Sequence, residues 1–144
     1  MQPGECRMRR VLTVLVPLCA LMLTGCATDK RSDVLTTTLN AYQHAVRWDG
    51  FADASKFIDP KVLEAHPLTP IEISRFDQYR VTDYDEGAGA TPAGENEVRQ
   101  VVTINLINIH SQAERTVIDR QTWHYDGKGH WWLTSGLPDL SPKD

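Results

Sequence analysis

The amino-acid sequence predicts an α+β fold, with helices first and then a curved antiparallel sheet of about four strands. Two patterns carry this prediction. Apolar residues recur at helical spacing just after residue 33. From about residue 78 onward, apolar and polar residues alternate in strand-like segments that are separated by turn residues. Helices followed by a run of strands are typical of α+β domains. We therefore expect one domain over residues 33–136 and a loose tail over 137–144.

The first helix is predicted to begin at Ser32 or Asp33, either of which can cap it, and to end near Trp48. The Asp49-Gly50 pair then stops it, because glycine is favoured just past a helix end. Apolar side chains spaced three or four residues apart form the stripe that should face the core: Leu35, Leu39, Tyr42 and Val46.

Two shorter helices are expected next, over residues 52–58 and 61–65. The second begins at Asp59-Pro60, a pair that suits the cap and the first position of a helix. The segment 66–70 contains two prolines and is interpreted as a loop, because a proline disfavours helix in the residue before it.

Four strands are predicted, over residues 78–84, 97–110, 115–125 and 130–135. Residues 86–96 are rich in Gly, Ala and Pro, and we expect them to form a mobile loop. Turns at Gln112-Ala113 and Gly127-Lys128 would fix how the last three strands pair.

These turns predict which side chains share a face of the sheet, because directly opposed residues lie on the same face. The second turn places Trp123 opposite Trp132, and the first places Val102 opposite Trp123. The predicted core face carries Val98, Val102, Ile104, Leu106, Val117, Trp123, Tyr125 and Trp132.

Two polar side chains, Asp119 and Gln121, also fall on this core face. A buried carboxylate is costly unless it is paired, and burial raises its pKa. One interpretation is that Asp119 lies near an open rim of the sheet, bonded to Asn108 or to an arginine.

The N-terminal segment has the features of an export signal. Arg7, Arg9 and Arg10 precede the apolar run Val11–Leu23, which holds 13 residues with only Thr13 polar. As a helix this run spans roughly 20 Å, less than the hydrocarbon core of about 30 Å. Its length therefore fits a secretory signal better than a permanent anchor.

Leu23-Thr24-Gly25-Cys26 follows and resembles the lipobox of bacterial lipoproteins: an aliphatic residue, two small residues and the cysteine that is acylated. The resemblance implies that residues 1–25 are a signal peptide removed before Cys26, whose acyl chains attach the protein to the membrane. Residues 26–32 would be a short tether ahead of the domain.

The same resemblance implies a location. In Gram-negative lipoproteins an aspartate directly after the acylated cysteine favours retention in the inner membrane, and this chain has Ala27 there. We therefore expect an outer-membrane, periplasm-facing protein in a Gram-negative source, and a protein of the cell membrane in any other.

The element order of the domain resembles the NTF2-like (cystatin-like) cone, in which a long N-terminal helix packs on a curved sheet. The mature part is also similar to small lipoproteins of Proteobacteria that carry no assigned activity. Enzymes with the cone fold, such as ketosteroid isomerases, keep a carboxylate and a tyrosine inside it. The resemblance implies a second interpretation, in which Asp119 pairs with Tyr42 in a pocket that also holds Gln121 and Trp123.

Many NTF2-like domains dimerise through the outer face of the sheet. By that resemblance, a homodimer contact could use the residues that we predict on the outer face, namely Ile107, Ile118 and Trp131.

Composition and motifs exclude several classes of function. A formal charge of −4 without a basic face argues against a nucleic-acid partner. The sequence contains no nucleotide-binding or nucleophile motif. Its five histidines form no HxxxH pair, and the predicted register puts His124 and His130 on opposite faces. We therefore predict no metal and no cofactor.

The expected function is that of a membrane-anchored accessory or binding module without catalytic activity. It would hold an envelope protein, an envelope polymer or a small apolar ligand near the membrane. The alternative is an isomerase or hydrolase of a small apolar substrate, with Asp119 as the base and Tyr42 as the proton donor.

Overall fold

The computed structural model describes residues 25–141. Its helical part consists of α2 (Gly25–His44), the π-helical turn η1 (Ala45–Asp49), α3 (Phe51–Ala54), the 3-10 turn η2 (Ser55–Phe57), α4 (Pro60–Ala65) and α5 (Pro70–Phe76). The strands that follow are β1 (Tyr79–Asp85), β2 (Thr91–Pro92), β3 (Glu97–Asn108), β4 (Glu114–Tyr125) and β5 (Trp131–Leu133).

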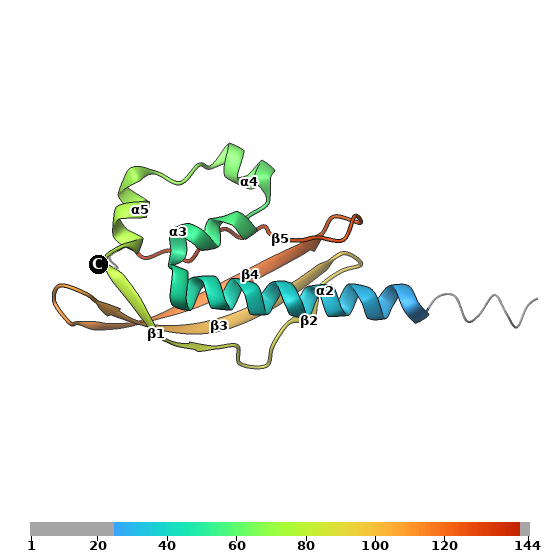
Figure 1. Ribbon diagram of the computed structural model, residues 1–144, viewed down its shortest axis with the longest axis horizontal. Coiled ribbons are helices and arrows are strands. Elements are labelled where there is room, and N and C mark those ends of the chain that lie inside the picture. The colour runs from blue at the N-terminus through green and yellow to red at the C-terminus, as the bar shows by residue number, and fades with distance from the viewer. Residues whose placement is uncertain (1–24, 142–144) are drawn as a thin grey trace, which may run out of the picture. The chain divides into compact units, whose positions relative to one another are not determined.

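The α+β prediction is confirmed, although the sheet of the described chain has five strands where about four were expected. All pairs are antiparallel, in the order β1-β3-β4-β5, and the short β2 pairs with the beginning of β3. Figure 1 shows α3, α4 and α5 on one side of this sheet. By internal contacts the chain divides into residues 1–33 and 34–144, and the hydrophobic core belongs to the second unit.

Helix α2 begins earlier than predicted. It starts at Gly25 rather than at Ser32 or Asp33, so residues 26–32, expected to be a tether, are helical. The sequence has no glycine or proline between Gly25 and Gly50, so a helix meets no strong breaker there. The predicted apolar stripe is confirmed, because Tyr42 and Val46 are buried while Leu35 and Leu39 pack against the core.

The stop at Asp49-Gly50 is also confirmed. The last turn widens into η1, and the Gly50 amide donates to the Ala45 carbonyl at 2.8 Å. Gly50 has a φ of 97°, a left-handed conformation that glycine adopts at little cost.

The short helices follow the prediction in part. The segment expected as one helix over 52–58 splits into α3, which begins one residue earlier and buries Phe51 and Ala54, and η2, which is followed by the buried Ile58. Asp59 caps α4 as expected, since its Oδ1 accepts from the Lys61 amide at 2.8 Å.

Helix α5 is absent from the sequence prediction. The Glu72 amide donates to Thr69 Oγ1 at 3.3 Å, and the Thr69 amide donates to Glu72 Oε2 at 2.8 Å. This is a capping box, with Pro70 at the first helical position. The interpretation of residues 66–70 as a loop was therefore right only up to the cap.

The β3–β4 register differs from the prediction by four residues, because Val98 rather than Val102 lies opposite Trp123. The face assignment survives, since side chains alternate with a period of two and an even displacement keeps every residue on its side. The core-facing residues predicted on these two strands are accordingly buried, except Tyr125, which is half-buried.

The register differs because the connecting loop is longer than the predicted two-residue turn and is centred two residues earlier in the chain. Asn108 Oδ1 accepts from the amides of His110 at 2.9 Å and Ser111 at 3.0 Å. Gln112 takes a left-handed φ of 58° and donates its amide to the Asn108 carbonyl. The asparagine side chain thus stabilises a wider turn than the sequence prediction assumed.

The β4–β5 register differs by one residue, and this reverses the faces. Trp123 lies opposite Leu133, and Trp131 lies opposite Tyr125. Trp131 is only 4% exposed and belongs to the core, whereas Trp132 is on the other face. The predictions of Trp132 as a core residue and of Trp131 on the outer face are therefore wrong.

Asp126 accounts for this difference. Its Oδ1 accepts from the amides of Lys128 at 2.7 Å and His130 at 3.0 Å, and its own amide donates to the His130 carbonyl at 3.0 Å. The turn therefore contains three residues, 127–129, instead of two. An odd change in turn length moves every later side chain to the opposite face.

Strand β1 brings Tyr84 into the core. The β1–β3 register shifts between Val81 and Asp83, and Tyr84 then lies opposite Ile104. The segment 86–96, expected to be a loop throughout, contains β2.

The C-terminal segment is packed on the domain as far as residue 141, so the prediction of a loose tail is wrong for 137–141. Leu140 is buried. Arg115 donates from Nη1 to the Leu140 carbonyl at 2.9 Å and from Nη2 to the Ser141 carbonyl at 2.8 Å. Residues 142–144 lie outside the described part.

Candidate functional site

The residues of the predicted pocket come together in the interior, where α2 packs on β4. Tyr42, Asp119, Gln121 and Trp123 are all buried. The rings of Tyr42 and Trp123 meet edge to face, with their centroids 5.2 Å apart. The two polar residues therefore point into the core, as the face assignment predicted.

Gln121 is the centre of a hydrogen-bond network. Its Nε2 donates to Asp119 Oδ2 at 2.8 Å and to the Tyr84 hydroxyl at 3.0 Å. Its Oε1 accepts from Trp123 Nε1 at 3.1 Å. The prediction that Asp119 bonds to Asn108 or to an arginine is wrong. Gln121 donates to the Asp119 carboxyl group instead, and the Asn108 side chain caps the β3–β4 loop.

Burial sets the protonation of the cluster. Loss of hydration raises the pKa of Asp119 to about 6, although the hydrogen bond from Gln121 opposes this shift. Burial, and next the nearby Asp119 charge, raise the pKa of Tyr42 well above its ordinary value. Burial likewise raises the pKa of Tyr84. The site therefore favours the neutral form of each group.

Two buried polar atoms of the described chain have no hydrogen-bond partner, the Tyr42 hydroxyl and Gln100 Oε1. Gln100 lies opposite Gln121 on β3. The sequence prediction omitted both Gln100 and Tyr84 from the cluster. Strand alternation was a usable signal for Gln100, because it stands between Val98 and Val102, two predicted core residues.

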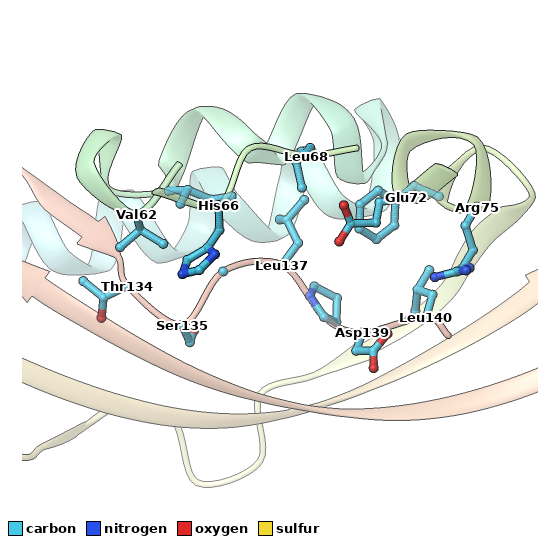
Figure 2. Close-up of a pocket in the computed structure, with 14 residues that line it drawn as sticks. Val62, His66, Leu68, Glu72, Arg75, Thr134, Ser135, Leu137, Asp139 and Leu140 are labelled. Atoms are coloured by element: carbon cyan, nitrogen blue, oxygen red, sulfur yellow. The ribbon is translucent and has the colours of Figure 1, made fainter. Parts of the chain in front are cut away.

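A separate cleft of about 360 Å³ opens between the α4–α5 segment and residues 134–140. In Figure 2, Leu68 and Leu137 occupy its middle, with His66 toward one end and Glu72, Arg75 and Asp139 toward the other. The apolar part of its wall consists of Ile58, Val62, Leu68, Phe76, Leu137, Pro138 and Leu140.

Contacts at both ends hold the two walls of this cleft together. At one end, Ile58 bridges Leu133 in parallel, and the Asp59 amide donates to the Leu133 carbonyl at 2.9 Å. At the other end, Arg75 Nη1 donates to Ser141 Oγ at 3.0 Å. The segments diverge between these contacts, which leaves the hollow. None of the residues that form the buried polar cluster lines this cleft, namely Tyr42, Tyr84, Gln100, Asp119, Gln121 and Trp123.

The charged end of the cleft has groups of both signs. Hydrogen bonds from the backbone and side chain of Thr69 lower the pKa of Glu72. Hydrogen bonds from Ser141 lower the pKa of Asp139. The Arg75 charge lowers both further, so the two carboxylates are ionised at neutral pH.

The outer face of the sheet carries exposed apolar residues. Val101 is 53% and Ile118 48% exposed, and Ile107 is half-buried. Of the residues predicted for a dimer contact, Trp131 is not available, because it lies in the core.

The two histidines of the last hairpin are not separated by the sheet as predicted. His124 lies opposite Trp132, and the His130 ring is 5.8 Å from the Trp132 ring, so both flank the same side chain. Within residues 25–141, no group of three or more His, Cys, Asp or Glu is placed to hold a metal ion. In the same residues, no helix combines the length and apolar character needed to cross a membrane.

The arginine-rich segment, the apolar run and the first half of the Leu23-Thr24-Gly25-Cys26 box lie outside the described residues. No family model, curated protein or solved structure matches the chain.

Proposed function

We propose that the protein is a lipid-anchored lipoprotein of the bacterial envelope whose α+β domain is a non-catalytic binding module for a small ligand. The cleft between the α4–α5 segment and residues 134–140 carries the binding part of this proposal. Its volume of about 360 Å³ lies near the lower end of the range for ligand sites, about 300–1,000 Å³. Its lining, largely apolar with a few convergent polar groups, is also typical of such sites.

The sequence supports the anchor. Arginines, a 13-residue apolar run and the lipobox-like segment ending in Cys26 occur in the order of a lipoprotein signal. Cleavage before Cys26 would leave the whole core in place, because every core residue lies at Val34 or beyond. With Ala27 after the cysteine, we propose attachment to the outer membrane of a Gram-negative cell, facing the periplasm.

Labelling with an alkynyl fatty acid, followed by membrane fractionation, tests the anchor. The wild-type chain should carry the label and fractionate with the outer membrane. Cys26→Ser should lose both properties, whereas Cys19→Ser, within the apolar run, should keep them. A wild-type protein without label would refute the anchor and leave the binding module to be judged separately.

Backbone amide NMR shifts on titration with 3-methyl-1-butanol, a small apolar alcohol, test the binding module. The chain from residue 26 onward, carrying Cys26→Ser to prevent acylation, should show saturable shifts at residues that line the cleft. Leu137→Trp, which fills the cleft, should abolish them, and Ile118→Trp on the outer face should not. Shifts absent from the cleft, or unaffected by Leu137→Trp, would contradict this function.

We also propose that the outer sheet face contacts a protein partner, a second copy of this chain in the first instance. Exposed Val101 and Ile118 support this, and the α+β architecture is compatible with an NTF2-like cone. Sedimentation equilibrium of the wild type and of Ile118→Lys tests the homodimer. A wild-type monomer at all concentrations would exclude it.

A cone-fold enzyme acting on a small apolar substrate is the second candidate. The raised pKa of Asp119, about 6, and the unpartnered Tyr42 hydroxyl favour it. Against it, both groups are buried and neither lines the cleft. If an isomerase or hydrolase activity is found, Asp119→Asn should abolish it; full activity in that variant would exclude this candidate.

A further inference from the structure

We infer that the cleft binds an apolar α-amino acid as its zwitterion. The charged end of the cleft receives the ammonium and carboxylate groups, and the apolar middle receives the side chain. This inference rests on the proposed binding function, because it names the ligand class of the same cleft.

Charges of both signs face one small region. Glu72 and Arg75 are three residues apart on α5, a spacing that places them on the same helix face. Asp139 comes from the opposite wall. An ammonium and a carboxylate attached to one carbon can meet such a region together, whereas a ligand with a single charge satisfies only one sign.

The charged side chains keep unused hydrogen-bonding groups. Within the described chain, Arg75 uses only Nη1, toward Ser141 Oγ, and the remaining donors of its guanidinium can pair with a carboxylate. Both bonds from Thr69 go to Oε2 of Glu72, so Oε1 remains for an ammonium.

A second guanidinium acts on Asp139 from outside the cleft. Arg115 holds the Leu140 and Ser141 carbonyls and, after Arg75, also lowers the pKa of Asp139. The charged groups that line the cleft itself are the Glu72 and Asp139 carboxylates and the Arg75 guanidinium. A ligand that carries both an ammonium and a carboxylate finds a partner of opposite charge for each of its groups there.

The rest of the cleft selects an apolar side chain. Leu68 and Leu137 flank its middle (Figure 2), and a polar side chain placed there would lose hydration without gaining partners. Its volume of about 360 Å³ suits a single residue better than a folded peptide.

Four probes with the same branched apolar body test the inference: L-leucine, 4-methylpentanoate, 3-methylbutylamine and 3-methyl-1-butanol. Each is titrated into the chain from residue 26 onward carrying Cys26→Ser, and amide shifts of the cleft residues are followed. Leucine should bind about tenfold more tightly than either singly charged analogue, which corresponds to about 1.4 kcal/mol of charge-assisted hydrogen bonding.

Two variants locate the charged contacts. Glu72→Gln, which can still close the capping box, and Arg75→Met should each weaken leucine binding about tenfold. In Glu72→Gln, binding of the alcohol should stay unchanged, and this shows that the cleft is intact. Arg75→Met also removes the bond to Ser141 Oγ that joins the two walls, so in this variant alcohol binding measures how far the cleft itself has changed. Glu64→Gln and Arg120→Met remove exposed charges outside the cleft, so they should alter neither probe.

The outcomes separate the two proposals. If no probe, the alcohol included, shifts the cleft residues, the binding function itself fails. If the alcohol binds but leucine binds no more tightly than the amine or the carboxylate, the binding function stands and the zwitterion inference is overturned.

Discussion

Gln121 donates from Nε2 to Asp119 Oδ2 at 2.8 Å, and the two residues stand side by side on the core face of β4. Residues two apart in a strand point the same way, so this bond forms within a single strand. It aims the rest of the Gln121 amide at Tyr84 and Trp123. The buried polar cluster is thus organised by β4 and completed by a side chain of β1.

The free energy of unfolding should rise as the pH falls from about 7.5 to about 5, with a gain of about 1.4 kcal/mol. The folded-state pKa of Asp119 is about 6, above its ordinary value of 3.8. The folded protein therefore holds this proton more tightly than the unfolded chain. The stabilisation from the protonated Asp119 is complete at pH values below the pKa of this group in the unfolded chain. It is lost as the pH rises through the folded-state pKa of about 6. Denaturant titrations across this range measure it.

Asp119→Asn is the matched variant, because the amide keeps the shape and cannot ionise. It should raise the free energy of unfolding by about 2–3 kcal/mol near neutral pH and remove the rise between about pH 7.5 and 5. Below about pH 4 both proteins should lose stability, because the lowered pKa values of Glu72, Asp126 and Asp139 act there. An unchanged pH profile in the variant would contradict this role of Asp119.

Gln121→Leu should destabilise the domain by about 3 kcal/mol. The substitution keeps the volume but leaves Asp119, Tyr84 and Trp123 without their common partner. Gln78→Leu, on an exposed side chain ahead of β1, should cost less than about 1 kcal/mol. Equal effects of the two substitutions in denaturant titrations would mean that the network contributes nothing to stability.

Periodicity was enough to predict most of the elements and most of the core, although it missed α5 and the short β2. The spacing of Leu35, Leu39, Tyr42 and Val46 found the face of α2, and strand alternation found the burial of Asp119. These patterns depend only on the local geometry of helices and strands, which every residue of an element shares.

The strand registers were not predictable from periodicity, because two side chains set them. Asn108 and Asp126 accept hydrogen bonds from backbone amides within their own turns and make both turns longer. The first error was even and left the faces intact, whereas the second was odd and exchanged Trp131 with Trp132.

The cleft was missed for a different reason. Its walls are far apart in the sequence, and they meet only through contacts such as Asp59 with Leu133 and Arg75 with Ser141. The capping box of Thr69 and Glu72 was a local signal for α5 that the prediction did not use. Even with that helix placed, no local pattern relates it to the C-terminal segment.

Tyr42→Phe should leave the domain as stable as the wild type or stabilise it by about 1 kcal/mol. The Tyr42 hydroxyl is buried and has no hydrogen-bond partner in the described chain, so its removal loses no bond and relieves an unsatisfied group. Tyr84→Phe is the matched control, because its hydroxyl accepts from Gln121. That variant should cost about 1–2 kcal/mol. If Tyr42→Phe lowered the free energy of unfolding by more than Tyr84→Phe, this would contradict the assignment of the Tyr42 hydroxyl as unpaired and of the Tyr84 hydroxyl as bonded.

Arg115→Met should release the C-terminal wall of the cleft while leaving the sheet folded. Arg115 anchors the carbonyls of Leu140 and Ser141 from β4, and a methionine keeps the aliphatic stem but offers no donors. Amide hydrogen exchange should therefore accelerate by about tenfold or more at residues 139–141 and remain unchanged in β3 and β4. Arg120→Met, which removes an exposed charge from the same strand, should leave the exchange of both regions unchanged. Loss of protection throughout the sheet in Arg115→Met would show that the segment is part of the global fold. No change at all would show that the packing of Leu140 and the bond from Arg75 to Ser141 hold the segment without Arg115.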